Sequence, residues 1–350
     1  MPDIYLSQFT PQPKLVVKKT EVLKPKFPVF DAHNHMRGSF GGWEEKPINE
    51  ILDAMAAAGV KAYVDLDGGW GEDILYQHLD NVKAKAPERF FMFGGVDWAQ
   101  WAEQGDRFGE WAAERFRQQV ARGAQGLKIW KPFGLDVRDQ HGNLVAIDDP
   151  RLDPLFAAAG ELGLPVLMHI ADPVAFFDPQ DANNERYEEL NNHPDWHFPS
   201  PPYPPFMKLM TDFKSLVTRH RATTFIGAHV GCYAENLGWV GQMLDDCPNF
   251  YVDISARVGE LGRQPYSARR FFLHYADRIL FGIDAGIRLP RYRIYYHFLE
   301  TDDEYFNYSE TVIPRQGRWA VYGLYLPDDV LRKVYYENAE RLFGVTVAPL

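Results

Sequence analysis

Short apolar runs alternate with amphipathic stretches eight times along the chain. The apolar runs have the length and the Val, Ile, Leu and Phe content of buried β-strands, and the stretches between them carry apolar residues at helical spacing. The expected strands cover residues 28–30, 60–64, 90–96, 126–130, 165–169, 224–228, 250–254 and 279–283. The expected helices cover residues 48–58, 74–85, 108–122, 152–162, 206–220, 237–244, 267–275 and 327–343.

Strands that alternate regularly with helices predict a parallel sheet built from βαβ units, and eight units predict a closed (β/α)8 TIM barrel. An open, doubly wound α/β sheet is the rival fold, but no glycine-rich nucleotide-binding motif follows the first strand. Residues 1–26 are rich in Pro and Lys and are expected to form an irregular N-terminal arm. Residues 27–350 are expected to form the barrel as a single domain with long βα loops.

Three connections are longer than an ordinary βα turn. Residues 132–147 alternate between polar and apolar positions around a Gly-Asn pair, which predicts a hairpin. Residues 172–205 are rich in Pro, Asn and aromatic residues, and a loop of that length at a strand end is expected to be a lid. Residues 285–325 are rich in Tyr and are expected to be a further loop region.

Composition and charge narrow the class of protein. A hydrophobic content of 46% and an aromatic content of 15% are typical of a globular enzyme with a large core. The net charge of -11 argues against a nucleic-acid partner, and an anionic substrate would require local positive charge. We find no signal-peptide core and no apolar run long enough for a membrane span, so we expect a cytoplasmic protein that acts on a small molecule. Two cysteines are too few for a disulfide framework or a cysteine-rich zinc site.

Polar residues end four of the expected strands. His33 and His35 follow the first strand, and side chains two apart in a strand point to the same face. His169, His229 and Asp284 end the fifth, sixth and eighth strands. In a TIM barrel the C-terminal ends of all strands meet at one face, where active sites are built. Each residue alone could be structural, but their joint placement predicts a catalytic or metal site.

The spacing of these residues resembles that of a known family. The motifs that carry the resemblance are Asp31-x-His33-x-His35, His169 after the fifth strand, Gly227-Ala228-His229, Phe281-Gly282-Ile283-Asp284 and Asn338-Ala339-Glu340-Arg341-Leu342. They are similar to the amidohydrolase superfamily, in particular to the amidohydrolase-related branch that includes aminocarboxymuconate-semialdehyde decarboxylase, over about residues 27–345. The resemblance implies one divalent metal, usually Zn²⁺ although Mn²⁺ or another ion is possible, held by His33, His35, His169 and Asp284.

The resemblance also implies that His229 stands beside the metal as an acid–base or electrostatic group. Three neutral imidazoles and a carboxylate suit Zn²⁺ and leave room for a water, whose pKa zinc lowers to about 7. Asp284 could accept a proton from that water, and His229 could stabilise an oxyanion or protonate a leaving group. Other branches use a carboxylated lysine on the fourth strand to bridge two metals, and Lys128 lies in that strand.

Candidate substrate-binding residues lie in the loops after the strands. Arg37, Lys131 and Arg257 could bind a substrate carboxylate through charge-assisted hydrogen bonds. Trp70 and Trp130 could form the walls of an apolar pocket, or could be packing residues.

Structural roles are the alternative for the cationic residues. Arg257 in particular could form an ion pair with Asp253 or Glu260.

These residues are compatible with two reactions and with one role that is not enzymatic. The first is metal-dependent hydrolysis of a small, carboxylate-bearing amide, ester or lactone through a metal-activated water. The alternative is non-oxidative decarboxylation of a small carboxylic acid by a carbon–carbon lyase. A barrel that serves only as a binding scaffold is the third possibility, and the complete ligand set argues against it. A homodimer is a possible assembly.

Overall fold

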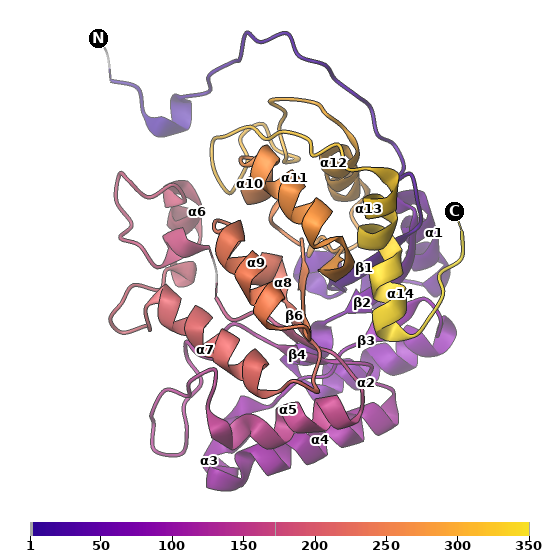
Figure 1. Cartoon of the computed structure of the whole chain (residues 1–350), viewed down its shortest axis with the longest axis vertical. Coiled ribbons are helices and arrows are strands. Elements are labelled where there is room, and N and C mark those ends of the chain that lie inside the picture. Colours follow the sequence, from indigo (N-terminus) through magenta and orange to yellow (C-terminus); the bar gives the residue numbers. More distant parts are fainter. Residues whose placement is uncertain (1–2, 172, 350) are drawn as a thin grey trace.

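The computed structural model describes residues 3–171 and 173–349 and contains eight short parallel strands in that range (Figure 1). The strands are β1 (Val29–Asn34), β2 (Val60–Asp65), β3 (Phe90–Met92), β4 (Leu127–Ile129), β5 (Val166–Met168), β6 (Phe225–Gly227), β7 (Phe250–Asp253) and β8 (Ile279–Leu280). They pair in the order β1-β2-β3 and β4-β5-β6-β7-β8. Six of the strands lie within a predicted run and are shorter than it, whereas β1 and β2 continue past theirs, to Asn34 and Asp65.

Backbone hydrogen bonds join the two sheets into one closed barrel. Gly94, just past β3, forms a parallel bridge with Leu127 of β4. On the other side, the Ala32 amide donates to the Phe281 carbonyl at 2.8 Å, which links β1 to the end of β8. Every sheet edge is therefore paired, and the structure is the (β/α)8 barrel that the sequence predicts.

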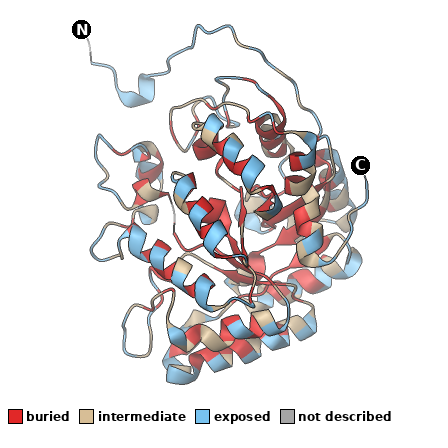
Figure 2. Cartoon of the chain, viewed as in Figure 1, coloured by how far each residue is buried: buried red, intermediate tan, exposed pale blue. Residues whose placement is uncertain are grey.

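Helices surround the barrel, with their buried faces on the strands and their exposed faces outward (Figure 2). The longer ones are α1 (Ile48–Ala58), α2 (Glu72–Asn81), α4 (Phe108–Arg122), α5 (Asp153–Glu161), α7 (Phe206–Arg219), α9 (Leu237–Asp246), α11 (Pro265–His274) and α12 (Leu289–Glu300). The last predicted helix is continuous but divided into α13 (Asp328–Arg332), a π-helical turn (Lys333–Glu337) and α14 (Asn338–Phe343). Short helical segments in the loops are α3 (Trp101–Gln104), α6 (Tyr187–Asn192), α8 (Ala228–Gly231) and α10 (Val258–Leu261).

The prediction of a loop over residues 285–325 is wrong for its first part, where α12 lies. Tyr292, Tyr295, Tyr296 and Leu299 follow helical spacing and are all buried. The buried hydroxyls have partners, since Tyr292 donates to Asp31 at 2.6 Å and Tyr296 donates to the Ala58 carbonyl at 2.7 Å. A tyrosine-rich segment is therefore a buried helix here, because the barrel satisfies the phenol groups.

The barrel interior is filled by alternate side chains of the strands. At the end opposite the C-terminal strand ends, the aromatic ring of Phe343 in α14 closes the barrel. Its centroid lies 5.2 Å from that of Phe30 in β1 and 5.2 Å from that of Phe91 in β3. The interior is thus a packed core and not a pore, and only the opposite end is open for a site.

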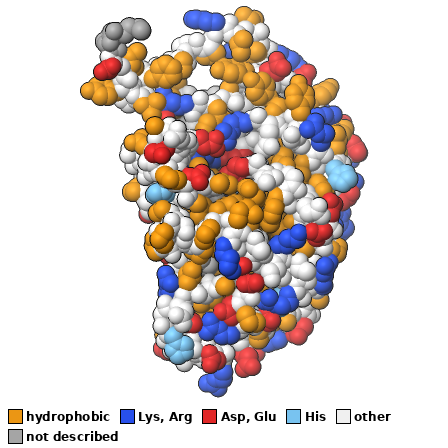
Figure 3. Space-filling model, turned by 60° about the vertical axis from the view of Figure 1, so that its left-hand side comes forward, with side chains coloured by type: hydrophobic (Ala, Val, Ile, Leu, Met, Phe, Trp, Pro, Cys, Tyr) orange, Lys and Arg blue, Asp and Glu red, His pale blue; other side chains and the backbone are white. Residues whose placement is uncertain are grey.

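The N-terminal arm runs along the outside of the barrel and extends away from it (Figure 1). Its only helical segment among the described residues is one 3₁₀ turn (Leu6–Gln8). Figure 3 shows hydrophobic side chains along this arm, where Ile4, Tyr5 and Val16 are exposed. Ion pairs such as Lys18 with Asp302, at 2.6 Å, attach it to the loop after α12. Among the described residues no helix is both long and apolar enough to cross a membrane.

Two of the long connections behave as the sequence predicts. Arg138 and Leu144 form an antiparallel bridge within the expected hairpin. The segment expected to be a lid begins with Asp172, which lies outside the described residues, and its remainder contains α6. Phe176 and Trp196 from this segment line the cavity that also contains His169. The lid therefore lies over the C-terminal strand ends.

Candidate metal centre

Three side chains from two adjacent strand ends point at one another. His33 lies in β1, His35 follows it, and Asp284 follows β8, which pairs with β1. The Asp284 Oδ1 atom is 3.9 Å from His33 Nε2 and 3.4 Å from His35 Nε2. These ligand atoms all lie within 4.8 Å of one another, which is the spacing that one metal ion requires.

Hydrogen bonds fix both imidazoles in the orientation that metal binding needs. His33 Nδ1 lies 2.8 Å from Asp253 Oδ2, and His35 Nδ1 lies 2.7 Å from Asp67 Oδ1. A carboxylate accepts, so each Nδ1 donates and each Nε2 keeps its lone pair for a ligand. Burial lowers the pKa of His33, and the nearby Lys128 charge acts in the same direction, so the ring is held neutral. Asp253 and Asp67 are site residues that sequence reasoning missed, because their partners are distant in sequence.

Asp284 provides the test of whether a metal fits. Its Oδ1 atom is buried and has no hydrogen-bond partner in the described structure, although it faces two imidazole nitrogens. A buried carboxylate oxygen without a donor is costly unless a cation satisfies it. Two neutral imidazoles and this oxygen therefore fit a divalent ion, in agreement with the ligand set that the resemblance implies.

His229 stands next to this group, directly after β6. Its Nδ1 donates to the Ser255 carbonyl at 2.9 Å, and its Nε2 lies 3.8 Å from Asp284 Oδ2. Burial lowers the pKa of His229 well below its ordinary value, and Arg257 adds to this effect. The backbone amide of His229 donates to Asp253 Oδ1 at 3.1 Å, so Asp253 holds both His33 and His229. The structure thus places a neutral imidazole beside the ligand set.

Backbone strain accompanies this geometry. His229 has a φ of 57° and Asp284 a φ of 53°, both in the left-handed region that is uncommon for residues other than glycine. Val230 follows with a φ of 60°, which is rarer still for a β-branched side chain. Such conformations cost about 1–3 kcal/mol each and persist where the surrounding structure enforces them. The strand ends therefore hold the site at the expense of local stability.

His169 completes the group of strand-end histidines. Its ring meets that of His229 edge-on, with centroids 4.5 Å apart, and it lies 6.5 Å from the Trp130 ring. It lines the same cavity as His33, His35 and Asp284. All four ligands expected from the sequence, together with His229, therefore surround one space.

That space is a cavity of about 310 Å³ beneath the lid. Aromatic side chains form much of its wall, namely Phe40, Trp130, Phe176 and Trp196. Four cationic side chains also line it, namely Lys128, Lys131, Arg186 and Arg257. The cavity therefore combines an apolar wall with local positive charge, although the chain as a whole is acidic.

The expected substrate-binding residues fall into two groups. Lys131, Arg257 and Trp130 line the cavity. The side chain of Arg37 is exposed and is not among the lining residues, so the structure does not bring it to the site. Trp70 contacts the site from outside, with its ring centroid 4.9 Å from that of His35.

Arg257 does not form the ion pair that was its structural alternative. It is buried, and its Nη1 donates to the Ala256 carbonyl at 3.0 Å. Asp253 is occupied by His33, and Glu260 pairs with Arg186 instead. The guanidinium of Arg257 therefore lies at the cavity wall with N–H groups that can still donate hydrogen bonds.

Lys128 is buried in β4 and faces the same cavity. Burial lowers its pKa to about 8. Its Nζ atom lies 5.4 Å from the centroid of the Trp130 ring. A bridging role for this lysine stays a prediction.

Arg186 is a further cavity residue that the sequence did not reveal. Only 1% of its side chain is exposed, although it belongs to the lid. It pairs with Glu189 at 2.6 Å and with Glu260 of α10, while its Nε atom has no partner in the described structure. A loop arginine gives no local signal of such burial, because its two carboxylates come together only when the lid folds over α10.

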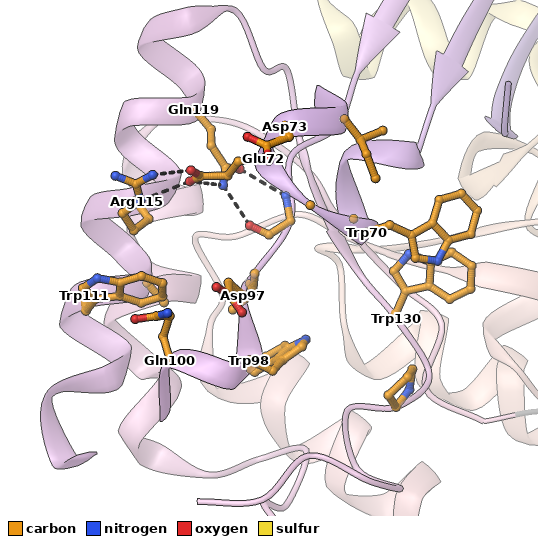
Figure 4. Close-up of a pocket in the computed structure, with 17 residues that line it drawn as sticks. Trp70, Glu72, Asp73, Asp97, Trp98, Gln100, Trp111, Arg115, Gln119 and Trp130 are labelled. Atoms are coloured by element: carbon orange, nitrogen blue, oxygen red, sulfur yellow. Dashed lines mark hydrogen bonds and ion pairs between the residues drawn. The ribbon is translucent and has the colours of Figure 1, made fainter. Parts of the chain in front are cut away.

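A larger cavity of about 880 Å³ lies on the far side of two tryptophans (Figure 4). The Trp70 and Trp130 rings, with centroids 4.4 Å apart, border it. Its one arginine, Arg115, is paired with Glu72, which also accepts a hydrogen bond from Gln119 (Figure 4). No histidine is among the described residues that line it, so the smaller cavity is the candidate metal site.

A second buried cluster of the same residue types lies between β2 and α2. His78 Nδ1 lies 2.6 Å from Asp65 Oδ2 and 3.9 Å from Asp67 Oδ2. Asp67 Oδ2 also accepts from the Met36 amide at 2.8 Å, and its Oδ1 is bound to His35. This cluster therefore supports the metal site from behind and does not face the cavity.

Solved structures with the same fold include three decarboxylases. One is 2,6-dihydroxybenzoate decarboxylase from Rhizobium, which is 16% identical with a TM-score of 0.56 over 91% of this chain and 98% of that chain. Dihydroxybenzoic acid decarboxylase from Polaromonas sp. JS666, with bound manganese and the inhibitor 2-nitroresorcinol, is 15% identical with a TM-score of 0.56 over 91% and 97%. The third, 5-carboxyvanillate decarboxylase from Sphingomonas paucimobilis, is 16% identical with a TM-score of 0.50 over 86% and 84%.

At these identities the likeness establishes the TIM-barrel fold and not the reaction. No curated protein sequence is significantly similar to the chain. The family model described as amidohydrolase matches residues 31–345, which include all five strand-end residues of the site. The chain belongs to the amidohydrolase family.

Proposed function

We propose that the protein is a metal-dependent, non-oxidative decarboxylase of a small aromatic carboxylic acid. The observation that carries this proposal is the composition of the 310 Å³ cavity, where four cationic side chains and an aromatic wall surround the metal-binding group. The carboxylate of an aromatic acid matches the cationic side chains, and its ring matches the aromatic wall. The three similar structures named above are all decarboxylases of aromatic acids by name, which supports the same reaction.

The metal in this proposal is held by His33, His35, His169 and Asp284, and Zn²⁺ suits this ligand set. Mn²⁺ is the alternative, and the Polaromonas enzyme contains it. When bound there, a divalent ion would supply Lewis acidity toward a carboxylate or a neighbouring oxygen of the substrate. Asp67 and Asp253 keep the two imidazoles of β1 oriented for it.

The cationic side chains bind and orient the substrate in this scheme. Arg257 presents a buried guanidinium with unused donors, and Lys131 lies at the edge of the lid, with its Nζ 5.2 Å from the Trp196 centroid. Trp130 and Phe176 exclude water from the ring of the substrate. These contacts hold the bond to the departing carboxylate in place while the lid covers the site.

Decarboxylation breaks the bond between the ring carbon and the carboxylate, releases CO₂ and leaves the electron pair on the ring carbon. A proton must then reach that carbon. Two carboxyl groups line the cavity, and Glu189 is paired with Arg186. The other, Asp284, lies beside His229, whose Nε2 is 3.8 Å from its Oδ2. We assign proton transfer to this pair: Asp284 delivers the proton to the ring carbon, and the neutral His229 takes up a replacement proton from solvent at Nε2 and passes it to Asp284.

Hydrolysis of an amide, ester or lactone, which the sequence suggested first, would use the same side chains. Direct measurement of products separates the two reactions. The enzyme, loaded with Zn²⁺ or Mn²⁺, is incubated with a panel of hydroxybenzoates and with matched aryl esters and lactones. CO₂ release is measured by a coupled assay, and deuterium from D₂O is located on the product ring by NMR.

We expect CO₂ release that depends on the metal, with one deuteron at the carbon that lost the carboxylate. Ester or lactone cleavage without CO₂ release would instead support the hydrolase. Metal-free protein that stays inactive after addition of metal, and binds none, would contradict both reactions.

A further inference from the structure

A second cavity of about 220 Å³ adjoins the metal cavity on the side of α12. It is formed by α12 and by the loop that follows this helix, over residues 301–325. Both cavities are lined by Glu189, Ala256, Asp284 and Gln316. The two spaces therefore adjoin at these four residues, and Asp284 lines both.

Three arginines line this second cavity, and two of them have no carboxylate partner among the residues that the structure describes. Arg288 is exposed and pairs with Glu310 at 2.8 Å. Arg291 of α12 is half-buried, and its Nη1 donates to the Tyr308 carbonyl at 3.4 Å. Arg315 is exposed and forms neither an ion pair nor a side-chain hydrogen bond with the described residues. A half-buried guanidinium without a counter-charge is unusual, because burial of an unpaired charge costs free energy.

None of the three carboxylates that line this cavity, Glu189, Asp284 and Glu310, pairs with Arg291 or Arg315 among the described residues. Glu189 pairs with Arg186 at 2.6 Å, and Asp284 faces the imidazoles of the metal site. The Tyr295 oxygen accepts from the Ala256 amide at 2.6 Å, so its own hydroxyl hydrogen can still be donated. The cavity thus offers two unpaired guanidinium groups and a phenol donor, within a chain whose net charge is -11.

We propose that this cavity is an anion subsite that binds a second carboxylate of the substrate. The inference rests on the proposed function and narrows its substrate class to dicarboxylic acids. One carboxylate lies at the metal site, and the second lies beyond Asp284 between Arg291 and Arg315. Continuity of the two cavities at Asp284 is what allows one molecule to reach both, and bidentate Arg–carboxylate contacts supply the affinity.

Binding of matched monoanions and dianions tests the proposal without any turnover. The metal-loaded protein is titrated by calorimetry with benzoate, isophthalate and terephthalate at a pH near 8, where all their carboxylates are ionised. We expect at least one dianion to bind about 10-fold or more tightly than benzoate, as a charge-assisted contact predicts. Because no step depends on catalysis, the subsite can be confirmed even if decarboxylation is not, and it can fail while decarboxylation stands.

Two arginines of the same helix supply the variant and its control. Arg291→Met should abolish the preference for the dianion while leaving benzoate binding within about 2-fold, since benzoate has no group for the subsite. Arg293→Met is the matched control, because Arg293 lies outside the cavity lining and its Nε donates to the Leu23 carbonyl at 3.2 Å. It should keep the full preference. Arg315→Met, at an exposed position, gives a second reading if Arg291→Met does not fold.

The outcomes are distinct. Equal affinity for benzoate and both dianions, no binding of any of them, or equal weakening of all by Arg291→Met would overturn the subsite. Inorganic phosphate identifies the other source of an anion. If phosphate binds in an Arg291-dependent manner and no dianion gains over benzoate, the cavity holds a separate anion and the dicarboxylate assignment is wrong.

Discussion

Two buried clusters of histidine and aspartate lie side by side at the end of the barrel. In one, His33 and His35 face Asp284 across the gap between β1 and β8. In the other, Asp65 and Asp67 surround His78, and all of these atoms are as close together as those of the first cluster. Residue type and distance therefore do not separate a metal site from a structural cluster.

The difference lies in which atoms have partners. In the first cluster the buried Oδ1 atom of Asp284 has no hydrogen-bond partner in the described structure. The Nδ1 atoms of His33 and His35 bind Asp253 and Asp67, which leaves both Nε2 atoms facing Asp284 at the cavity. In the second cluster the carboxylate oxygens accept hydrogen bonds from side chains or amides, and only His78 Nε2 is unpartnered. A metal needs several unused ligand atoms around one open position, so only the first cluster can bind it.

Removal of one histidine from each cluster gives the largest contrast. His35→Ala should lower metal affinity by about 10³-fold or more, because it removes a ligand atom. This loss is larger than the one expected when a residue that only orients a ligand is removed. His78→Ala should leave the metal content unchanged, because its ring faces no cavity. Elemental analysis of both proteins after dialysis against a weak chelator checks this. Equal metal loss in the two variants would show that the clusters act as one site.

A variant of His229 tests which residues of the first cluster are metal ligands. Its ring is near the ligands, but its Nε2 is 3.8 Å from Asp284 Oδ2 and we assign it to chemistry. His229→Gln should keep the metal and lower kcat by about 10²-fold or more, the usual effect of losing an acid–base group. Metal content and steady-state rates on the same preparation are the measurement. If the metal is lost together with the activity, His229 is a ligand.

Asp67 connects the two clusters, because its Oδ1 binds His35 and its Oδ2 faces His78. Asp67→Asn should lower metal affinity by about 10- to 100-fold through the loss of the carboxylate that orients His35. Asp65→Asn is the matched control and should change affinity by less than about 3-fold, since Asp65 contacts no expected ligand. Competition with a fluorescent chelator gives both values. A larger loss for Asp65 would contradict this assignment of the second cluster.

His78 tests whether the second cluster is structural. His78→Gln removes a buried hydrogen bond to Asp65, so the free energy of unfolding should fall by about 1–3 kcal/mol. Urea unfolding of the metal-free proteins measures this without a contribution from the ligand. An unchanged unfolding midpoint, with reduced activity of the loaded enzyme, would instead give His78 a functional role.

The fold and the strand-end ligands could be predicted because both depend on local pattern. Eight apolar runs of strand length, each followed by a helix, are compatible with few topologies. In a barrel, the residues that follow the strands all lie at the same face. The prediction of a loop over α12 was wrong because the buried face of this helix consists largely of tyrosines. A tyrosine-rich segment indicates an exposed loop unless its hydroxyls have buried acceptors, which Asp31 and the Ala58 carbonyl provide here.

The partners of the ligands could not be predicted in the same way. Asp253 and Arg186 act through contacts with His33 and Glu260 that are distant in sequence. Arg291 was not predicted as a binding residue. It is a candidate because no carboxylate pairs with it among the described residues, and no pattern in a sequence shows which charges stay unpaired. Arg37 illustrates the converse, since this cation near His35 in the sequence is exposed and does not line the cavity.

Phe343 has a consequence for the order in which the molecule is completed. Ribosomal synthesis proceeds from the N-terminus, so β1, with His33, emerges long before α14. Until Phe343 arrives, the rings of Phe30 and Phe91 lack the side chain that covers them at the lower end of the barrel. The strand that carries His33 is therefore among the first parts to be synthesised, but its barrel is closed only by one of the last helices. A nascent chain released before α14 exposes aromatic surface that chaperones recognise.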